Sequence, residues 1–293
     1  MKSGREQFMT ASHRAKRWLA LAGSIVLASI IGAAGYTYFL SERLIDRRYD
    51  SPLSAVAVLN DSASIAEGER LAHISGCFGC HGDQLQGRIW DDDFVWGRLN
   101  APNLPEIARE YSPAELARVI RAGVRPDGSG VMTMPSSMFY YLSDEAISRL
   151  VAFLRFAPVA DGLRYEFRPG WAVRWDLVRG SRRFQPDVIA ELGPRMREPA
   201  PGDTIALGRY IARTACTECH GLSLEGDWGP DLVVAAAYTP EEFANFMATG
   251  EASGGRELPV MSRVARGRFS HLTVDEVTAL GAFLRERAAG REN

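Results

Sequence analysis

The 293-residue sequence has few residues that form covalent cross-links or bind metals, with only four cysteines and five histidines. It also has no excess of positive charge, because its formal net charge is −2, and nothing therefore suggests a nucleic-acid partner. No sustained alternation of apolar and polar residues is present, and this absence predicts an all-α fold. The length and the apolar content of 46% are ordinary for a folded protein of about two domains.

All four cysteines fall in two pentapeptides of the same form, Cys77–His81 and Cys216–His220, each reading Cys-x-x-Cys-His. Two cysteines three residues apart lie on one face of a helical turn. From there their sulfurs can reach the two vinyl groups on one porphyrin edge, and the adjacent histidine can bind the iron. This spacing is the attachment signature of a c-type haem, so the sequence predicts two haem c groups. The residues predicted to attach them are Cys77, Cys80, His81, Cys216, Cys219 and His220.

Two other uses of four cysteines remain open at this point, namely two disulfides or one zinc site. A redox-active Cys-x-x-Cys disulfide does not require a following histidine. A zinc ribbon would bring both cysteine pairs together, although they lie far apart in this sequence. The histidine that recurs in the same place favours haem over both alternatives.

Residues 18–40 contain no charged side chain, and this run is long enough to cross a bilayer core of about 30 Å. Basic residues precede it and only Glu6 opposes them, so the positive-inside bias places residues 1–17 in the cytoplasm. The alternative is a signal peptide cleaved after Gly32-Ala33-Ala34. The apolar run exceeds the roughly 7–15 residues usual in signal peptides, which favours a retained anchor. Either interpretation exports the remaining chain, as suits covalent haem, which bacteria attach outside the inner membrane. We therefore expect a single-pass protein of the bacterial inner membrane, with periplasmic haem domains.

The exported part contains one sequence plan twice. Residues 111–116 (Tyr-Ser-Pro-Ala-Glu-Leu) return as residues 238–243 (Tyr-Thr-Pro-Glu-Glu-Phe), and both read as helix starts with a Ser or Thr cap, Pro at N1 and Glu at N3. Both helices should end near a glycine, Gly123 or Gly250. Each copy is thus expected to hold about three helices, with long loops and no strands.

The repeat gives a plan of the chain by residue number. It comprises a cytoplasmic N-terminus (1–17), a transmembrane anchor (18–40), a linker (41–60), a first domain (61–157), a connector (158–200) and a second domain (201–289). The connector contains Trp171, Trp175 and eight arginines, unlike a pure linker. We expect it to be partly ordered and to fold back over a domain, or to contact the membrane surface or a partner subunit.

The order of motifs in each copy resembles that of class I cytochrome c domains, and the resemblance covers both copies. It implies an all-α protein with two tandem class I cytochrome c domains after an N-terminal transmembrane helix. It also implies that the first and last helices of each domain cross closely. Gly68 and Gly208 would permit the close approach, and Phe153 and Phe283 would supply aromatic packing.

The resemblance further implies that a methionine in the loop before the last helix is the sixth iron ligand. The first copy offers Met132, Met134 and Met138. Met134 is followed by proline, as in the family's Met-Pro form, and is the predicted ligand. Met132 is the second choice, and Met138 is expected to pack in the core.

In the second copy the same argument selects Met261, whereas Met247 falls inside a helix and is expected to fill the core. The iron ligands predicted by the sequence and the resemblance are His81, Met134, His220 and Met261. The family also uses a proline carbonyl to orient the proximal histidine, and the matching prolines are Pro102 and Pro230. The loop before Pro102 is the longer one and holds Trp90, Phe94 and Trp96. It is interpreted either as a docking loop or as an ordinary surface loop.

Methionine and histidine together close an iron to oxygen and peroxide, which favours electron transfer over haem catalysis. We therefore interpret the chain as an electron carrier without enzymatic activity or a small-molecule substrate, which exchanges electrons with redox proteins or with subunits of a membrane respiratory complex. One alternative is a fixed dihaem subunit of a terminal oxidase or a membrane-bound dehydrogenase. Another is a dihaem peroxidase, against which Met134 and Met261 argue because that enzyme needs an open or switchable iron.

Overall fold

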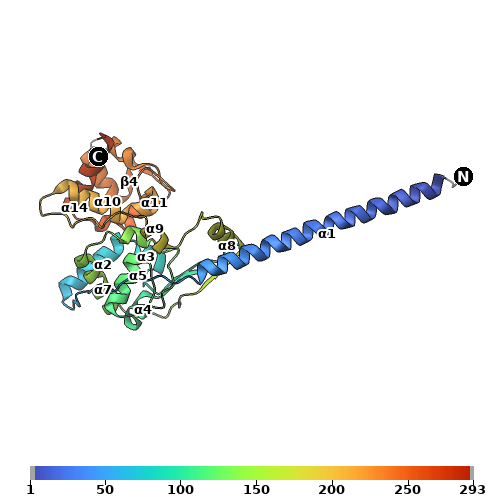
Figure 1. Cartoon of the computed structure of the whole chain (residues 1–293). Helices are drawn as coiled ribbons and strands as arrows, with labels where there is room; N and C mark the ends of the chain where they lie inside the picture. The colour runs from blue at the N-terminus through green and yellow to red at the C-terminus, as the bar shows by residue number, and fades with distance from the viewer. Residues whose placement is uncertain (1–3, 291–293) are drawn as a thin grey trace.

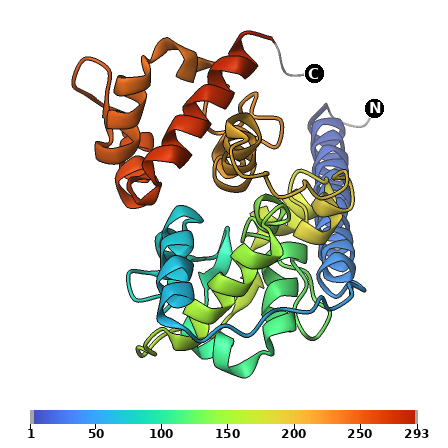
Figure 2. The same cartoon turned by 90° about the vertical axis from the view of Figure 1, so that its left-hand side faces the viewer.

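The computed structural model describes residues 4–290, with side chains from residue 16 onward. Residues 1–3 of the predicted cytoplasmic segment therefore lie outside the described residues. One long helix extends away from a body made of two helical units (Figure 1). The first unit (residues 62–157) and the second unit (residues 204–289) lie one above the other in Figure 2.

The long helix α1 (Gly4–Ile45) extends beyond the predicted anchor at both ends. Its segment Lys16–Ile45 contains an 18-residue window with a mean hydropathy of 1.9, and by length and composition it is the one candidate membrane span among the described residues. A signal sequence near an N-terminus has the same properties. Beyond the expected end of the anchor at residue 40, residues 41–45 continue the helix and pack against the body.

The elements of the first unit, in order, are α2 (Ser62–Ile74), α3 (Cys77–His81), β1 (Arg88–Asp93), β2 (Gly97–Ala101), α4 (Leu104–Glu110), α5 (Pro113–Ala122), α6 (Ser136–Phe139) and α7 (Asp144–Phe156). The connector contains β3 (Phe167–Pro169), α8 (Trp171–Val178) and α9 (Gln185–Ile189). The second unit contains α10 (Thr204–Ala215), α11 (Thr217–His220), η1 (Leu232–Ala237), α12 (Pro240–Thr249), β4 (Glu251–Ala252), β5 (Arg256–Glu257), α13 (Met261–Gly267), η2 (Phe269–His271) and α14 (Val274–Ala288).

The two predicted helix starts are confirmed at α5 and α12. Ser112 and Thr239 each cap their helix, and in both cases a glutamate three residues later closes a capping box. The glycines that end these helices, Gly123 and Gly250, have φ of 65° and 76°. That left-handed conformation is one that glycine adopts at no steric cost.

The first and last helices of each unit cross closely, α2 with α7 and α10 with α14. A Cβ atom on Gly68 would lie 2.8 Å from the Cβ of Phe153 and would overlap a backbone carbonyl of α7. A Cβ atom on Gly208 would lie 2.6 Å from the Cβ of Phe283 and would overlap a carbonyl of α14. Both crossings therefore require glycine, as the resemblance implies.

Each unit has its own hydrophobic core, and the two cores meet at the boundary between the units. The first core is centred on the buried α7 residues Ile147 and Leu150, and the second on Leu280 and Phe283 of α14. Tyr210 of α10 packs against both cores, and its hydroxyl accepts a hydrogen bond from the Ser143 amide at 3.1 Å. The two units are thus packed against each other rather than joined only through the chain.

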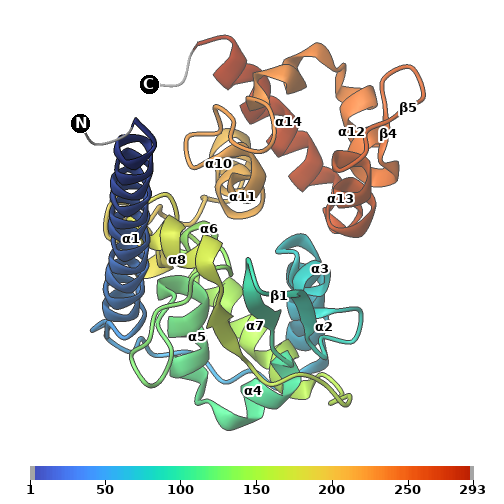
Figure 3. The ribbon, with the colours of Figure 1, turned by 90° about the vertical axis from the view of Figure 1, so that its right-hand side faces the viewer.

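The prediction of an all-α fold without strands is wrong in detail. Strands β1, β2 and β3 form an antiparallel three-stranded sheet, in which β3 comes from the connector, and β4 pairs with β5 (Figure 3). These strands are two to six residues long and partly exposed. Such short strands do not hold enough alternating positions to produce a recognisable sequence period.

The connector folds back over the first unit, as expected, and builds a third hydrophobic cluster there. Val173 and Leu177 of α8 are buried with Leu99 of β2 and Phe184. Leu44 at the end of α1 packs against the same cluster. The connector therefore joins the end of the long helix to the sheet of the first unit.

Candidate functional site

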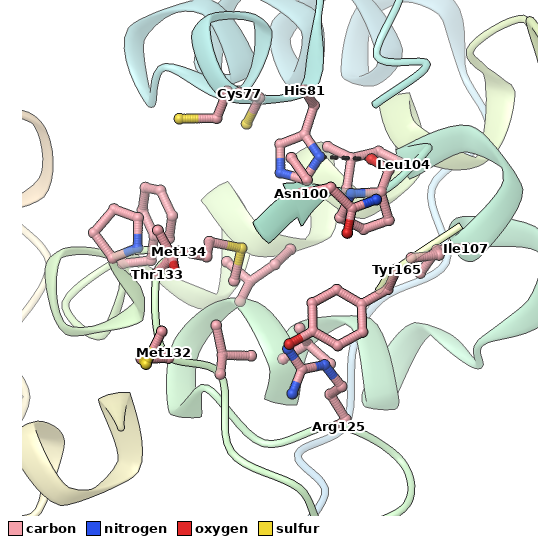
Figure 4. Close-up of a pocket in the computed structure, with 18 of the residues that line it drawn as sticks. Cys77, His81, Asn100, Leu104, Ile107, Arg125, Met132, Thr133, Met134 and Tyr165 are labelled. Carbon is pink, nitrogen blue, oxygen red and sulfur yellow. Dashed lines mark hydrogen bonds between the residues drawn. The ribbon is translucent and has the colours of Figure 1, made fainter. Parts of the chain in front are cut away.

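The motif Cys77–His81 forms the short helix α3, which begins directly after the left-handed residue Gly76. Its cysteines and histidine line one side of a largely apolar pocket, and Met134 lies on the other side (Figure 4). The pocket encloses about 1350 Å³ of empty space, part of which is open to solvent. The motif and the predicted methionine therefore share one cavity.

His81 is buried, and its Nδ1 donates a hydrogen bond to the carbonyl oxygen of Pro102 at 2.7 Å. This bond leaves Nε2 as the nitrogen that can bind a metal. Burial also lowers the pKa of His81 to about 4. The imidazole is therefore neutral near pH 7 and keeps the lone pair that a metal ligand needs.

His220 in α11 has the same arrangement in the second unit. It is buried, and its Nδ1 donates to the carbonyl oxygen of Pro230 at 2.7 Å. The residue before that proline, Gly229, lies so close that an added Cβ would be 2.8 Å from the His220 ring. The orientation of the imidazole is thus set in the same way in both units, although the two prolines follow their histidines at different spacings.

All four cysteines carry free thiols, and none forms the disulfide considered as an alternative. Burial raises the pKa of Cys77 and of Cys216 to about 12, and it raises the pKa of Cys80 and Cys219 as well. Within residues 16–290, no group of three or more His, Cys, Asp or Glu residues is arranged to hold a metal.

The three methionines of the first unit have different environments. Met134 precedes α6 in an irregular segment, is partly buried, and points its sulfur into the pocket (Figure 4). Met132 is buried in the third cluster, and its sulfur points away from the pocket centre in the same view. Met138 is fully buried in the first core. Of Met132 and Met134, it is Met134 whose sulfur faces the motif across the pocket (Figure 4).

The predicted methionine of the second unit, Met261, is the first residue of α13 and so begins a helix rather than lying in a loop. It is partly buried and packs against the second core. Met247, inside α12, is fully buried in that core. Met261 thus stays near the core surface, whereas Met247 is enclosed by apolar side chains.

Two polar residues of the first pocket were missed by the sequence analysis. The guanidinium of Arg125 lies 4.0 Å from the ring centre of Tyr165, and both residues line the pocket away from the cysteines (Figure 4). Burial raises the pKa of Tyr165, so its hydroxyl stays neutral. Tyr165 comes from the connector, which the side-chain amide of Asn100 holds through bonds to Arg164 and Glu166. No local residue spacing predicts that a side chain from a different segment of the chain will line this pocket.

The two Cys-x-x-Cys-His motifs are linked across the boundary between the units by Arg268. Its guanidinium donates to the carbonyl oxygen of Ile74 at 3.0 Å, three residues before the first motif, and to that of Ala215 at 3.2 Å, directly before the second. It also pairs at 2.9 Å with Glu218, which lies inside the second motif and lines the first pocket. One arginine side chain therefore spans the distance between the two motif segments.

Three stacked rings cross the same boundary. The imidazole of His73 stacks on the ring of Phe78, inside the first motif, and on the imidazole of His271 in η2, each at 4.0 Å between ring centres. This column and Arg268 fix the first motif against the second unit. Neither contact is predicted by the sequence pattern.

Comparisons with known proteins agree with this site. Residues 63–154 match the family described as cytochrome C oxidase, cbb3-type, subunit III. The chain is also similar to the cytochrome c subunit of alcohol dehydrogenase (quinone) from Gluconobacter oxydans (strain 621H), with 27% identity over 174 residues. That match covers 55% of this chain and 35% of the relative, so the chain spans about a third of the relative's length. Both matches support a cytochrome c, which implies a haem c and haem-based electron transfer.

The side chains that line the first pocket have the chemistry needed to hold a haem c. Its two thiols and the free Nε2 of His81 lie on one side, a thioether lies on the other, and most of the remaining lining is apolar. This set of donors is the one that c-type haem with Met/His ligation requires.

Proposed function

We propose that this chain is a membrane-anchored dihaem cytochrome c that carries electrons on the periplasmic side of a bacterial inner membrane. The observation that carries the proposal is the repeated site, in which a Cys-x-x-Cys-His motif is followed by a proline carbonyl at 2.7 Å from the histidine Nδ1. Two sites of this kind, each on its own helical core, are what two tandem cytochrome c domains need.

In this proposal Cys77 and Cys80 attach the first haem, and Cys216 and Cys219 attach the second. His81 with Met134, and His220 with Met261, are the iron ligands. Haem, when bound, supplies one-electron chemistry and a potential that a methionine ligand raises. The chain's part is to hold the imidazole through the proline carbonyl, to keep the thioether in place, and to exclude water with apolar side chains.

The polar end of the first pocket has a role in the same proposal. Arg125 and Tyr165 can donate hydrogen bonds to a carboxylate. Because the hydroxyl of Tyr165 is neutral, it adds no negative charge that would repel that carboxylate. They therefore suit a carboxylate of the cofactor, whose vinyl edge would face the cysteines.

Transfer between the two haems is favoured by the boundary between the units. Arg268 and the column of Phe78, His73 and His271 keep the two motifs in contact. A short and fixed separation is the condition for fast electron transfer within one chain. Electrons would enter at one haem and leave at the other, and the chain itself would catalyse no further reaction.

The more specific form of this proposal is that the chain is a permanent subunit of a membrane dehydrogenase or oxidase complex. It is supported by the relative, which is named as a subunit of a quinone-dependent alcohol dehydrogenase, and by the family name, which refers to an oxidase subunit. Purification in mild detergent tests this form, because a subunit copurifies with its complex and a free carrier is recovered alone.

An optical redox titration of the purified full chain tests the electron-transfer proposal. The wild type should show two low-spin centres, and Met134→Leu should lower the midpoint potential of one and abolish its methionine–iron absorption band. Met261→Leu should do the same to the other centre. The controls Met132→Leu and Met247→Leu keep the side-chain volume in the core and should leave both potentials unchanged. If both centres keep their potentials and bands in the Met134 and Met261 variants, the ligand assignment is wrong.

A further inference from the structure

Five large apolar side chains are exposed together beside the end of α1. They are Phe94 (79% exposed), Val95 (52%), Trp96 (39%), Trp171 (39%) and Trp175 (55%), and they are called the aromatic face below. Isolated exposed apolar residues are normal on a soluble surface, but a cluster of aromatic ones marks an interaction site. The aromatic face comes from two segments, the turn between β1 and β2 and the helix α8.

These two segments form one rigid unit. The carboxylate of Asp93 accepts hydrogen bonds from the amides of Val95 at 2.8 Å and Trp96 at 2.6 Å, which fixes the turn. The carbonyl oxygens of the same two residues accept from Ala172 and Gly170, each at 2.9 Å, which joins the turn to the start of α8. The aromatic face is therefore preorganised rather than part of a loose loop.

The two tryptophans on α8 are exposed even though another side of the same helix packs against a hydrophobic core. Val173 and Leu177, four residues apart, are buried in the third cluster on one side of the helix. Trp171 and Trp175 are also four residues apart and therefore share another side. Thus α8 has one apolar side that the protein buries and a second, aromatic side that it leaves open.

The aromatic face lies where the apolar part of α1 ends. Arg174 of α8 pairs with Glu42 at 2.6 Å and donates to the hydroxyl of Ser41 at 2.8 Å, and its guanidinium lies 4.3 Å from the ring centre of Tyr38. The uncharged run of α1 ends at Leu40. The helix α8 is thus fixed beside the point at which a membrane-spanning α1 would leave the bilayer (Figure 1).

We propose that the aromatic face is embedded in the headgroup region of the bilayer that α1 crosses, so that the first unit lies against the membrane. This inference depends on the proposed membrane anchor. Tryptophan favours the water–lipid boundary because its ring is largely apolar and its N–H is polar. Arg168 and Arg179 on the same segment pair with Glu166 and Asp176, but their side chains are exposed and can also contact lipid phosphates. Asp92 is paired with Arg98, which reduces its repulsion of anionic lipids.

The consequence for the proposed electron carrier is a fixed orientation of its first haem pocket. Trp90 of β1 and Phe167 of β3 line that pocket and also pack against the third cluster, which holds α8 and the end of α1. A bilayer that holds α8 would therefore hold the pocket at a set distance from the membrane surface.

Lipid photo-crosslinking on the full chain in nanodiscs of phosphatidylethanolamine and phosphatidylglycerol tests the proposal. A small fraction of the lipid carries a diazirine close to the headgroup, and adducts are located by mass spectrometry after digestion. Adducts are expected on the peptides that contain residues 94–96 and 171–175, in addition to α1. Trp228 of the second unit is 88% exposed and should carry none.

Variants distinguish insertion of the aromatic face into lipid from nonspecific labelling of exposed residues. The double variant Trp171→Ser/Trp175→Ser should lose adducts on residues 94–96 severalfold, because the face no longer enters the lipid. The matched control Trp228→Ser should label like the wild type. An unchanged haem absorption spectrum in each variant verifies that the protein is folded.

The pattern of adducts distinguishes this inference from the anchor on which it depends. Labelled α1 with an unlabelled aromatic face overturns the inference and leaves the anchor in place. Absence of label on both segments overturns both. A face that is labelled in nanodiscs but crosslinks to protein instead of lipid in native membranes would overturn the inference in favour of a partner subunit.

Discussion

Removal of the Arg268 guanidinium should uncouple the two helical units. In Arg268→Leu the carbonyl oxygens of Ile74 and Ala215 both lose a charged donor. Each hydrogen bond of this type contributes about 1.5–3 kcal/mol, which gives about 3–6 kcal/mol for the two. The pair with Glu218 adds little, because that carboxylate is partly exposed and stays hydrated. The bond to Ile74 crosses the boundary between the units, so about half of the loss falls there, and the bond to Ala215 is lost within the second unit.

Differential scanning calorimetry of the full chain in detergent measures this loss. For a unit of this size, about 1 kcal/mol corresponds to a shift of about 4–8 °C in Tm, so the lower transition should fall by at least about 10 °C and separate from the other. The control is Arg263→Leu, five residues earlier in the chain, whose exposed side chain donates to the carbonyl oxygen of Pro259 within the second unit. If the two variants unfold alike, the physical reasoning about Arg268 is refuted. Slower electron transfer between the haems in Arg268→Leu alone would extend the result to function.

Two further predictions concern the helix crossings and the response to acid. Gly208→Ala should destabilise the second unit by at least about 1–3 kcal/mol, because the new methyl group would lie 2.6 Å from Phe283 Cβ, whereas Gly267→Ala, with no atom within 4 Å, should not. Thermal denaturation compares them, and an equal Tm would contradict the close crossing. The hydrogen bond from Arg70 lowers the pKa of Glu67 below its ordinary value near 4.5. A lowered folded-state pKa gives stability that is present above the ordinary value and is lost as pH falls through the lowered one. The stabilities of the wild type and Glu67→Gln should therefore differ near pH 7 and converge in acid. A difference that persists in acid would exclude this ion pair as its cause.

The parts of the structure that depend on local sequence were predictable, and the parts that depend on distant contacts were not. The capped helix starts at Ser112 and Thr239 are confirmed because a capping box needs only four consecutive residues. The glycines at the two helix crossings also behave as the family resemblance implies. The capping boxes are local, whereas the crossings join residues far apart in the chain and were predictable only through the family resemblance.

The small sheet, the polar end of the pocket and the boundary between the units were missed. Strand β3 and Tyr165 arrive from the connector, and Arg268 reaches two motifs that are far apart in the chain. No residue spacing in the sequence predicts these long-range contacts, because they depend on how the units pack. In the longer loop before Pro102, Trp90 packs against the third cluster, whereas Phe94 stays exposed.

The most direct test of the central claim is the intact mass of the purified full chain, together with its haem content from the pyridine haemochrome spectrum. The account predicts a mass equal to the polypeptide plus two covalently bound haems. It also predicts that Cys77→Ser/Cys80→Ser and Cys216→Ser/Cys219→Ser each lose one of them. A mass equal to the polypeptide alone, or to the polypeptide with a single haem, would contradict the account.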